Sequence, residues 1–250
     1  ERSTPVRSTS IRTSVSATTN TPAAVTEDLA LKQKLFAQLE TLTRPDTPIV
    51  TNTSNYQIGA VTQGLKTASR MAGLHFFMPA HLVPLVEVVS AATTDVKVAE
   101  HLEAIMNAVG KAPIRVNKDI PGFVGNRLQH ALLREAMWMI NDGVTSAEGI
   151  DTAVRYGFGF RFIACGPFMQ KEMSGWDTNF AVATDLYPDL HNEKTPPPFF
   201  EKMVKQGKTL EQVIAAQPLK EFDAEWGKFR KTNDFIPFVY YSFAPYKPKQ

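Results

Sequence analysis

A histidine and a glutamate lie in two short apolar stretches that are close in the sequence. His75 lies within Met71–Phe77, and Glu87 lies within Leu85–Val89. Burying an ionisable pair on adjacent strands is costly unless the two groups satisfy each other. A carboxylate bonded to one imidazole nitrogen fixes the tautomer and makes the other nitrogen more basic. The pair is therefore a candidate general base for a hydroxyl proton; the alternative is a buried histidine with a chance acidic neighbour.

The elements that would position this pair alternate between helix and strand. Apolar residues recur at helical spacing in several segments, and short apolar runs lie between them. The expected helices cover residues 27–43, 57–66 and 96–109, and the expected strands cover 49–53, 71–77, 85–89 and 113–116. This alternation predicts an α/β fold with a partial Rossmann-like parallel sheet over residues 27–118.

A different pattern begins at Pro121. Apolar residues recur at helical spacing from Phe123 to Ile140, and Pro121 suits the first turn of that helix. Further helices are expected over residues 146–156, 166–186 and 199–205, and no strand pattern appears between 119 and 215. We therefore expect an all-helical domain over 119–215, whereas the tail, 216–250, has no clear period and stays unassigned.

The first 26 residues differ in composition from the rest. They are rich in Ser, Thr and Ala, with Arg2, Arg7 and Arg12 and no acidic residue after Glu1. This composition is typical of a flexible leader, and a cleavable organelle transit peptide and an uncleaved linker share it. Localisation therefore stays open between the cytoplasm and the mitochondrial matrix.

Charge and cysteine content narrow the classes of function. The formal net charge is only +2, which argues against nucleic-acid partners. The single cysteine, Cys165, cannot form an intrachain disulfide. No apolar run approaches the roughly 18 residues of a membrane span. The histidines show no ligand spacing with Cys or carboxylates, so we expect no metal site.

Several segments resemble, in order, motifs of the 3-hydroxyacyl-CoA dehydrogenase family. They are Glu27–Lys32, Asn52–Ser54, the two strands that carry His75 and Glu87, Pro121–Arg127 and Gly166–Phe168. The resemblance implies a dinucleotide-binding domain followed by a helical substrate and dimerisation domain, similar to the C-terminal domain of 6-phosphogluconate dehydrogenase. It also implies an acyl-CoA substrate, NAD as cofactor, and a homodimer or larger assembly.

The resemblance implies roles for four residues in catalysis. His75 would be the base, and Glu87 would orient it. Ser54 would contact the nicotinamide side and the substrate oxygen, although a serine at this position also suits a turn. Asn126 would donate to the thioester carbonyl, and its alternative is a solvated helix position.

Other matching positions concern the cofactor. In the family, Glu27, Lys32, Asn52 and Ser54 match cofactor-binding positions. From the sequence alone, Glu27 and Lys32 are an ordinary helix start, where acidic residues are favoured by the macrodipole. Met78 departs from the family pattern, which usually has asparagine between the aromatic residue and the proline.

The family's glycine-rich dinucleotide fingerprint is missing from this sequence. That turn lets backbone N–H groups hold the pyrophosphate, and Gly157–Gly159 cannot replace it because the third glycine and the preceding strand are absent. The expectation is that the N-terminal half of the domain is lacking and that NAD binding by this chain alone is weak or absent. The native polypeptide could be longer, a partner could supply that half, or the chain could be a degenerate relative.

Two functions of different class follow. The first is an NAD-linked oxidoreductase that oxidises the 3-hydroxyl of an acyl-CoA, with His75 as base. The alternative is a truncated, non-catalytic relative that acts as a binding or structural subunit. NAD binding by the purified chain discriminates between them.

Overall fold

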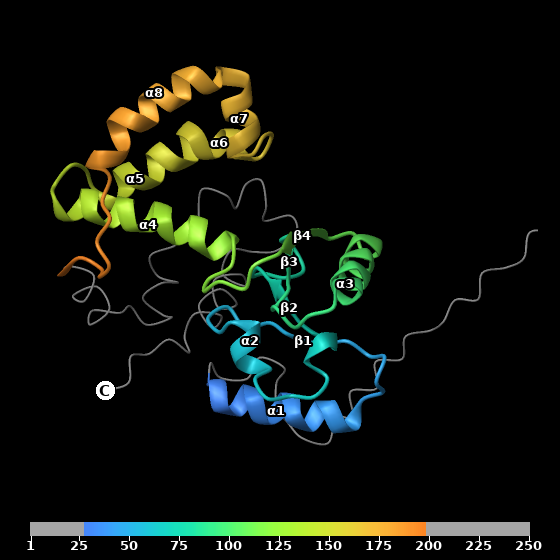
Figure 1. The fold of residues 1–250 in the computed structure, drawn as a ribbon. Helices are drawn as coiled ribbons and strands as arrows, with labels where there is room; N and C mark the ends of the chain where they lie inside the picture. Colours follow the sequence, from blue (N-terminus) through green and yellow to red (C-terminus); the bar gives the residue numbers. More distant parts are fainter. Residues whose placement is uncertain (1–27, 199–250) are drawn as a thin grey trace, which may run out of the picture. The chain divides into compact units, whose positions relative to one another are not determined.

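The computed structural model describes residues 28–198 of the chain, and two compact units divide this part (Figure 1). The first unit comprises residues 28–75 and 86–121. The second comprises residues 76–85 and 122–198. The segment that follows His75 thus belongs with the helices of the second unit rather than with the sheet.

The first unit is built on a four-stranded sheet with strand order β1-β2-β3-β4. The sheet is mixed, and β1 pairs with β2 in parallel, with Ile49 opposite Met71 and Thr51 opposite Gly73. The α/β class with a partial Rossmann-like sheet is confirmed, but the sheet is mixed and not parallel throughout as predicted. The elements are α1 (Leu29–Leu42), β1 (Ile49–Thr51), α2 (Ile58–Val61), η1 (Ala68–Arg70), β2 (Met71–Phe76), β3 (Leu85–Val89), α3 (Val96–Ala108) and β4 (Ala112–Val116).

The core of this unit lies on the central strands. Val86, Val88 and Val89 of β3 are completely buried, which explains why this strand has an almost continuous apolar sequence. Gly73 of β2 is required by packing, because a Cβ there would lie 2.8 Å from Ile58 Cδ1 and 2.9 Å from Val89 Cβ. The missing side chain therefore lets α2 approach the sheet closely.

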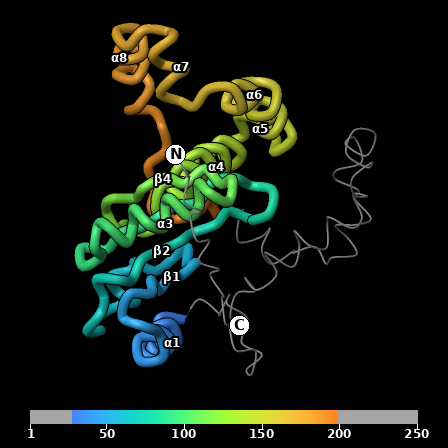
Figure 2. Tube along the Cα trace, turned by 90° about the vertical axis from the view of Figure 1, so that its right-hand side faces the viewer, coloured from blue at the N-terminus to red at the C-terminus, as the bar shows by residue number. Residues whose placement is uncertain are grey.

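Helix α1 lies beside β1 (Figure 2) and contacts α2 (Figure 1). Its first turn is capped by Asp28, whose Oδ1 accepts from the N–H of Leu31 at 3.0 Å. Phe36 of α1 packs in a buried cluster with Ile49, Val61 and Met71. The amphipathic pattern of α1 is thus used to cover the β1 side of the sheet.

Helix α2 is shorter than its predicted range, 57–66. It ends at Val61, and the Thr62 hydroxyl donates to the Ile58 carbonyl at 2.9 Å. Two residues later Gly64 has a φ of 80°, a left-handed conformation that a helix cannot contain. The prediction of a longer helix was wrong because the apolar spacing continues past this turn.

The described part of the second unit is helical. It contains α4 (Gly125–Asn141), α5 (Ala147–Ala153), a π turn (Val154–Phe158), α6 (Gly159–Phe162), α7 (Pro167–Ser174), α8 (Trp176–Leu186) and a 3₁₀ turn (Tyr187–Asp189). No described helix is long and apolar enough to cross a membrane. The expected helix 199–205 and the tail 216–250 lie outside the described residues.

Two helix boundaries in this unit differ from the prediction. Helix α4 begins at Gly125 rather than near Pro121, because Gly122 and Phe123 have φ values of 76° and 48° and turn the chain before the helix. The helical pattern over 166–186 is divided between α7 and α8 at Gly175, whose φ is 88°. Left-handed backbone interrupts a helix at both places.

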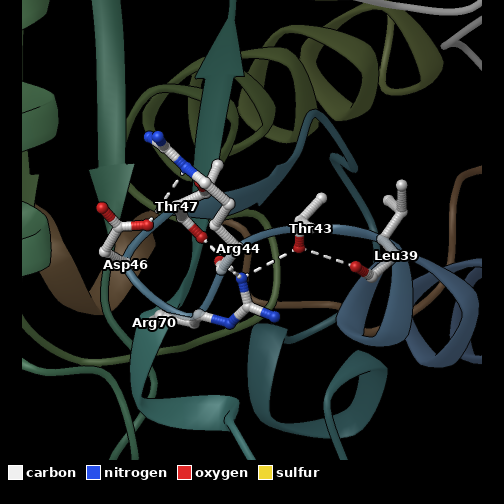
Figure 3. A network of polar contacts seen from close by, with 6 residues as sticks. All are labelled: Leu39, Thr43, Arg44, Asp46, Thr47 and Arg70. Carbon is white, nitrogen blue, oxygen red and sulfur yellow. Dashed lines mark hydrogen bonds and ion pairs between the residues drawn. The ribbon is translucent and has the colours of Figure 1, made fainter.

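A buried arginine joins α1 to the start of β2. Arg70 is only 6% exposed, and its Nη1 donates to the carbonyls of Arg44 at 2.6 Å and Thr47 at 2.9 Å (Figure 3). The same nitrogen donates to Thr43 Oγ1 at 2.9 Å, and Nη2 donates to the Glu40 carbonyl at 3.0 Å. The guanidinium therefore binds carbonyls at the C-terminus of α1 and in the following loop, where a cation is favoured.

The Glu40 side chain adds a pH-dependent contact to this region. Its Oε1 accepts from the Thr67 N–H at 2.6 Å and from the Thr67 hydroxyl at 2.8 Å, and these bonds, with Arg70 and Lys66 nearby, lower the pKa of Glu40.

A lowered pKa means that the carboxylate stabilises the fold above the usual glutamate pKa, and that this contribution is lost as the pH falls through the folded-state pKa. We expect Glu40→Gln to make the free energy of unfolding less dependent on pH between about pH 5 and pH 3. Urea unfolding across that range measures it, and an unchanged slope would contradict the assignment.

Candidate functional site

The centre of the site is a buried contact between β2 and β3. His75 Nδ1 lies 2.6 Å from Glu87 Oε2, and the two strands are neighbours in the sheet. The His75 side chain is 7% exposed and that of Glu87 is 0% exposed. The predicted contact between these two side chains is present. With Glu87 ionised, Nδ1–H donates to the carboxylate, and in the neutral ring Nε2 is then the basic nitrogen.

Asn52 and Ser54 lie in the loop that follows β1. The strand ends at Thr51, so both residues are at its carboxyl end. Because β1 and β2 run parallel with Thr51 opposite Gly73, this loop and His75 are at the same end of the sheet. Open α/β sheets bind ligands at the carboxyl ends of their strands. Asn52 is exposed and Ser54 is partly buried.

The chain after this loop is tied to the segment that leaves β4. Asp119 Oδ2 accepts from the Gly59 N–H at 2.8 Å, and the Asp119 carbonyl accepts from Gln57 Nε2 at 2.6 Å. Gln57 and Gly59 stand at the start of α2, where a carboxylate is favoured by the exposed N–H groups. Asp119 thus fixes the point at which the Ser54 loop enters α2.

Asn126 belongs to the second unit. It is the second residue of α4 and is partly buried. In the same unit the ring of Phe77 packs against Gly125, so closely that a Cβ on Gly125 would clash with the ring. The segment directly after His75 is therefore packed against the first turn of the helix that carries Asn126. Met78, next to Phe77, is 50% exposed.

The remaining predicted cofactor residues are at the N-terminus of the first unit. Lys32 lies in α1 and is 7% exposed, and its backbone N–H donates to the Asp28 carbonyl at 3.1 Å. Glu27 lies outside the described residues. Their assignment to the cofactor stays a prediction.

The arrangement supports proton abstraction at the end of a parallel strand pair. A buried imidazole held by a buried carboxylate is suited to take a proton from an alcohol. Among the described residues no group of His, Cys, Asp or Glu is arranged to hold a metal ion.

Sequence reasoning missed two residues next to this site, Thr53 and Asp119. Thr53 is 1% exposed, and its hydroxyl accepts from the N–H groups of Asn55 and Tyr56. Thr51 at the end of the strand and Thr53 two residues later were a signal for such a turn, because threonine hydroxyls bond to nearby backbone groups. Asp119, two residues before Pro121, offered no comparable local signal, since its partners lie 60 and 62 residues earlier.

Two family models match the chain in succession. The model described as 3-hydroxyacyl-CoA dehydrogenase, NAD binding domain, matches residues 7–120. The model described as 3-hydroxyacyl-CoA dehydrogenase, C-terminal domain, matches residues 122–214. The first match begins inside the stretch that the sequence reading took for a leader, so the prediction that the N-terminal half of this domain is missing is not borne out.

Similar proteins carry related names. The chain is 35% identical over 227 residues to the 3-hydroxyadipyl-CoA dehydrogenase of Escherichia coli, covering 90% of this chain and 46% of the relative. It is 35% identical over 190 residues to the human mitochondrial hydroxyacyl-coenzyme A dehydrogenase, covering 74% and 58%. The chain spans about half the length of the curated relatives it matches.

A solved structure has a similar fold over most of the chain. The crystal structure of 5-formyl-3-hydroxy-2-methylpyridine 4-carboxylic acid 5-dehydrogenase, described as an NAD⁺-dependent dismutase, has a TM-score of 0.73 and 28% identity. The match covers 87% of this chain and 71% of that structure.

Proposed function

Because the chain belongs to the 3-hydroxyacyl-CoA dehydrogenase family, we propose that it oxidises the 3-hydroxyl group of an acyl-CoA thioester with NAD. The observation that carries this proposal is the buried hydrogen bond between His75 Nδ1 and Glu87 Oε2, 2.6 Å long. Such a pair is suited to remove the proton of a secondary alcohol. The names of the relatives support the class of substrate.

His75 and Glu87 have complementary tasks in this proposal. Nε2 of His75 takes the hydroxyl proton as the electron pair of the O–H bond forms the new C=O bond, and the hydrogen on C3 leaves as hydride. The imidazole becomes an imidazolium, and the adjacent Glu87 carboxylate stabilises its positive charge. When bound, NAD supplies the acceptor for the hydride.

The residues fit the nicotinamide end of the cofactor better than its pyrophosphate. Ser54 and Asn52, at the carboxyl end of β1, are assigned to the nicotinamide side, and Asn126 to the thioester carbonyl. We also assign Glu27 and Lys32 to cofactor binding. The sequence has no glycine-rich strand-to-helix turn, which is the usual cradle for the pyrophosphate.

NAD binding tests the cofactor assignment. Without a glycine-rich turn, we expect isothermal titration calorimetry of the purified chain to give a dissociation constant weaker than micromolar. Ser54→Ala should weaken the binding further, whereas Ser174→Ala, an exposed position on α7, should not. Micromolar affinity without any partner would show that the pyrophosphate is held in some other way.

The same missing turn supports a second candidate. A relative that keeps the sheet and helices but holds the dinucleotide poorly could serve as a non-catalytic binding or structural subunit. The two candidates separate in a simple assay: a 3-hydroxyacyl-CoA that binds without NADH being formed, at saturating NAD, favours the subunit.

We also propose that the second unit forms a homodimer or a larger assembly. Leu128 and Leu132 of α4 and Val124, which directly precedes the helix, are spaced four residues apart, and their exposed fractions are 62%, 44% and 38%. Residues at this spacing share one helix face, and exposed apolar patches of this kind mark interaction sites. In α5, α7 and α8 no residue is buried, so these helices lack a closed core of their own.

A charge on this face should disrupt the assembly. We expect Leu128→Glu combined with Leu132→Glu to convert a dimer into a monomer, because an unpaired carboxylate would have to be buried in the interface. His130→Glu, an exposed position roughly 160° around the helix from Leu128 and Leu132, is the matched control and should leave the dimer intact. Light scattering at micromolar concentration measures both, and a monomeric wild type would refute the proposal.

A further inference from the structure

We propose that Thr53 is a positioning residue whose buried hydroxyl holds the turn that carries Ser54. This inference rests on the proposed role of Ser54 beside the nicotinamide and the substrate oxygen. The sequence motif points to Ser54 and assigns no task to the threonine before it.

Two successive threonine hydroxyls turn the chain as it leaves β1. Thr51 Oγ1 accepts from the Thr53 N–H at 3.3 Å. Thr53 Oγ1 then accepts from the N–H groups of Asn55 at 3.4 Å and Tyr56 at 3.2 Å. Ser54 lies in the sequence between Thr53, whose hydroxyl accepts these bonds, and the two residues that donate them. The Thr53 hydroxyl therefore determines the path of the Ser54 backbone.

The burial of Thr53 restricts the conformation of this turn. Its side chain is 1% exposed and is among the largest fully buried side chains of the described residues. A buried hydroxyl cannot exchange its partners for bulk water, so the bonded N–H groups are costly to release. The last pair of the parallel β1–β2 register is Thr51 and Gly73, and Thr53 and His75 each follow that pair by two residues. The turn therefore begins at the end of the sheet where the base lies.

The far end of the loop is held separately. Gln57 and Gly59 are bound by Asp119 at 2.6 Å and 2.8 Å. Between the two anchored ends lie residues 54–56, and the Thr53 hydroxyl receives two backbone N–H groups from this stretch. Loss of that hydroxyl should therefore free the Ser54 turn while α2 and the sheet keep their places.

The test compares three variants of the full chain. Thr53→Val keeps the shape of the side chain and removes the hydroxyl, whereas Thr53→Ser keeps the hydroxyl. Thr94→Val is the matched control, because Thr94 Oγ1 also accepts a backbone N–H, from Ala91 at 3.0 Å, and donates to the Met71 carbonyl at 2.7 Å. Met71 begins β2, at the opposite end of the strand from His75.

Activity gives the first readout. With 3-hydroxybutyryl-CoA and saturating NAD, we expect Thr53→Val to lower kcat about 10- to 100-fold, the scale of a small misplacement of a catalytic group, with a smaller change in KM for the thioester. Thr53→Ser should restore kcat, and Thr94→Val should lower Tm without lowering kcat. A kcat of Thr53→Val equal to that of Thr94→Val would overturn the proposal.

Amide hydrogen exchange gives a readout that does not depend on the reaction. The N–H groups of Asn55 and Tyr56 should exchange faster in Thr53→Val than in wild type and in Thr53→Ser. If wild type shows this protection but no turnover, the proposed oxidation fails while the structural task of Thr53 stands. If protection at both amides is unchanged in Thr53→Val, the positioning role is refuted whatever the activity.

Discussion

His75→Gln is expected to lower kcat for 3-hydroxyacyl-CoA oxidation by at least about 100-fold, the scale of general-base catalysis. Glutamine keeps a polar side chain of similar reach but offers no basic nitrogen to the hydroxyl proton. Glu87→Gln should lower kcat as well, because a neutral amide cannot stabilise the imidazolium that forms. Initial rates of NADH formation at saturating NAD measure both effects.

The matched control for His75→Gln is the same substitution at another histidine of the first unit. His101 lies on α3 and is exposed, so His101→Gln should leave kcat unchanged. A correctly folded His75→Gln protein with wild-type turnover would remove His75 from the mechanism.

The largest effect on stability is expected at Arg70. Arg70→Met should lower the free energy of unfolding by about 2–4 kcal/mol, because buried carbonyls and a threonine hydroxyl lose a charged donor. Arg70→Lys should recover only part of this loss, since an ammonium cannot reproduce the spread of donors of the planar guanidinium. Urea unfolding followed by circular dichroism gives the values.

A neighbouring arginine separates the effect of burial from that of charge. The Arg44 side chain is 81% exposed, and its Nε lies 3.4 Å from Asp46 Oδ1 (Figure 3). Surface ion pairs contribute little, so Arg44→Met should change stability by no more than about 0.5 kcal/mol. Equal losses for Arg44→Met and Arg70→Met would show that the network around Arg70 is not a main support of the fold.

Much of the sheet, and the pairing of His75 with Glu87, could be predicted from the local sequence pattern. The continuous apolar run of β3 and the alternation of short strands with amphipathic helices predict an α/β layer. His75 and Glu87 were identified because an ionisable residue buried in such an apolar run is costly unless a polar partner forms a hydrogen bond with it. Their 2.6 Å contact follows from the pairing of two strands that are close in the sequence.

The features that could not be predicted depend on contacts between distant segments. In the sequence Arg70 is a single basic residue directly before an expected strand, and its carbonyl partners lie 23 to 30 residues earlier. The start of α4 was misplaced because the left-handed φ of Phe123 has no sequence signal in a residue that rarely adopts it. The short α2 is a similar case, since its end is set by Gly64.

The most direct measurement of the central claim uses 3-hydroxybutyryl-CoA that carries deuterium at C3. The wild-type chain is incubated with this substrate and saturating NAD, and the NADH formed is analysed by mass spectrometry. The proposed oxidation predicts that deuterium appears in the NADH from wild type and at a rate at least about 100-fold lower in His75→Gln. Absence of deuterated NADH from the correctly folded wild-type chain, or its formation at equal rates in both proteins, would contradict the account.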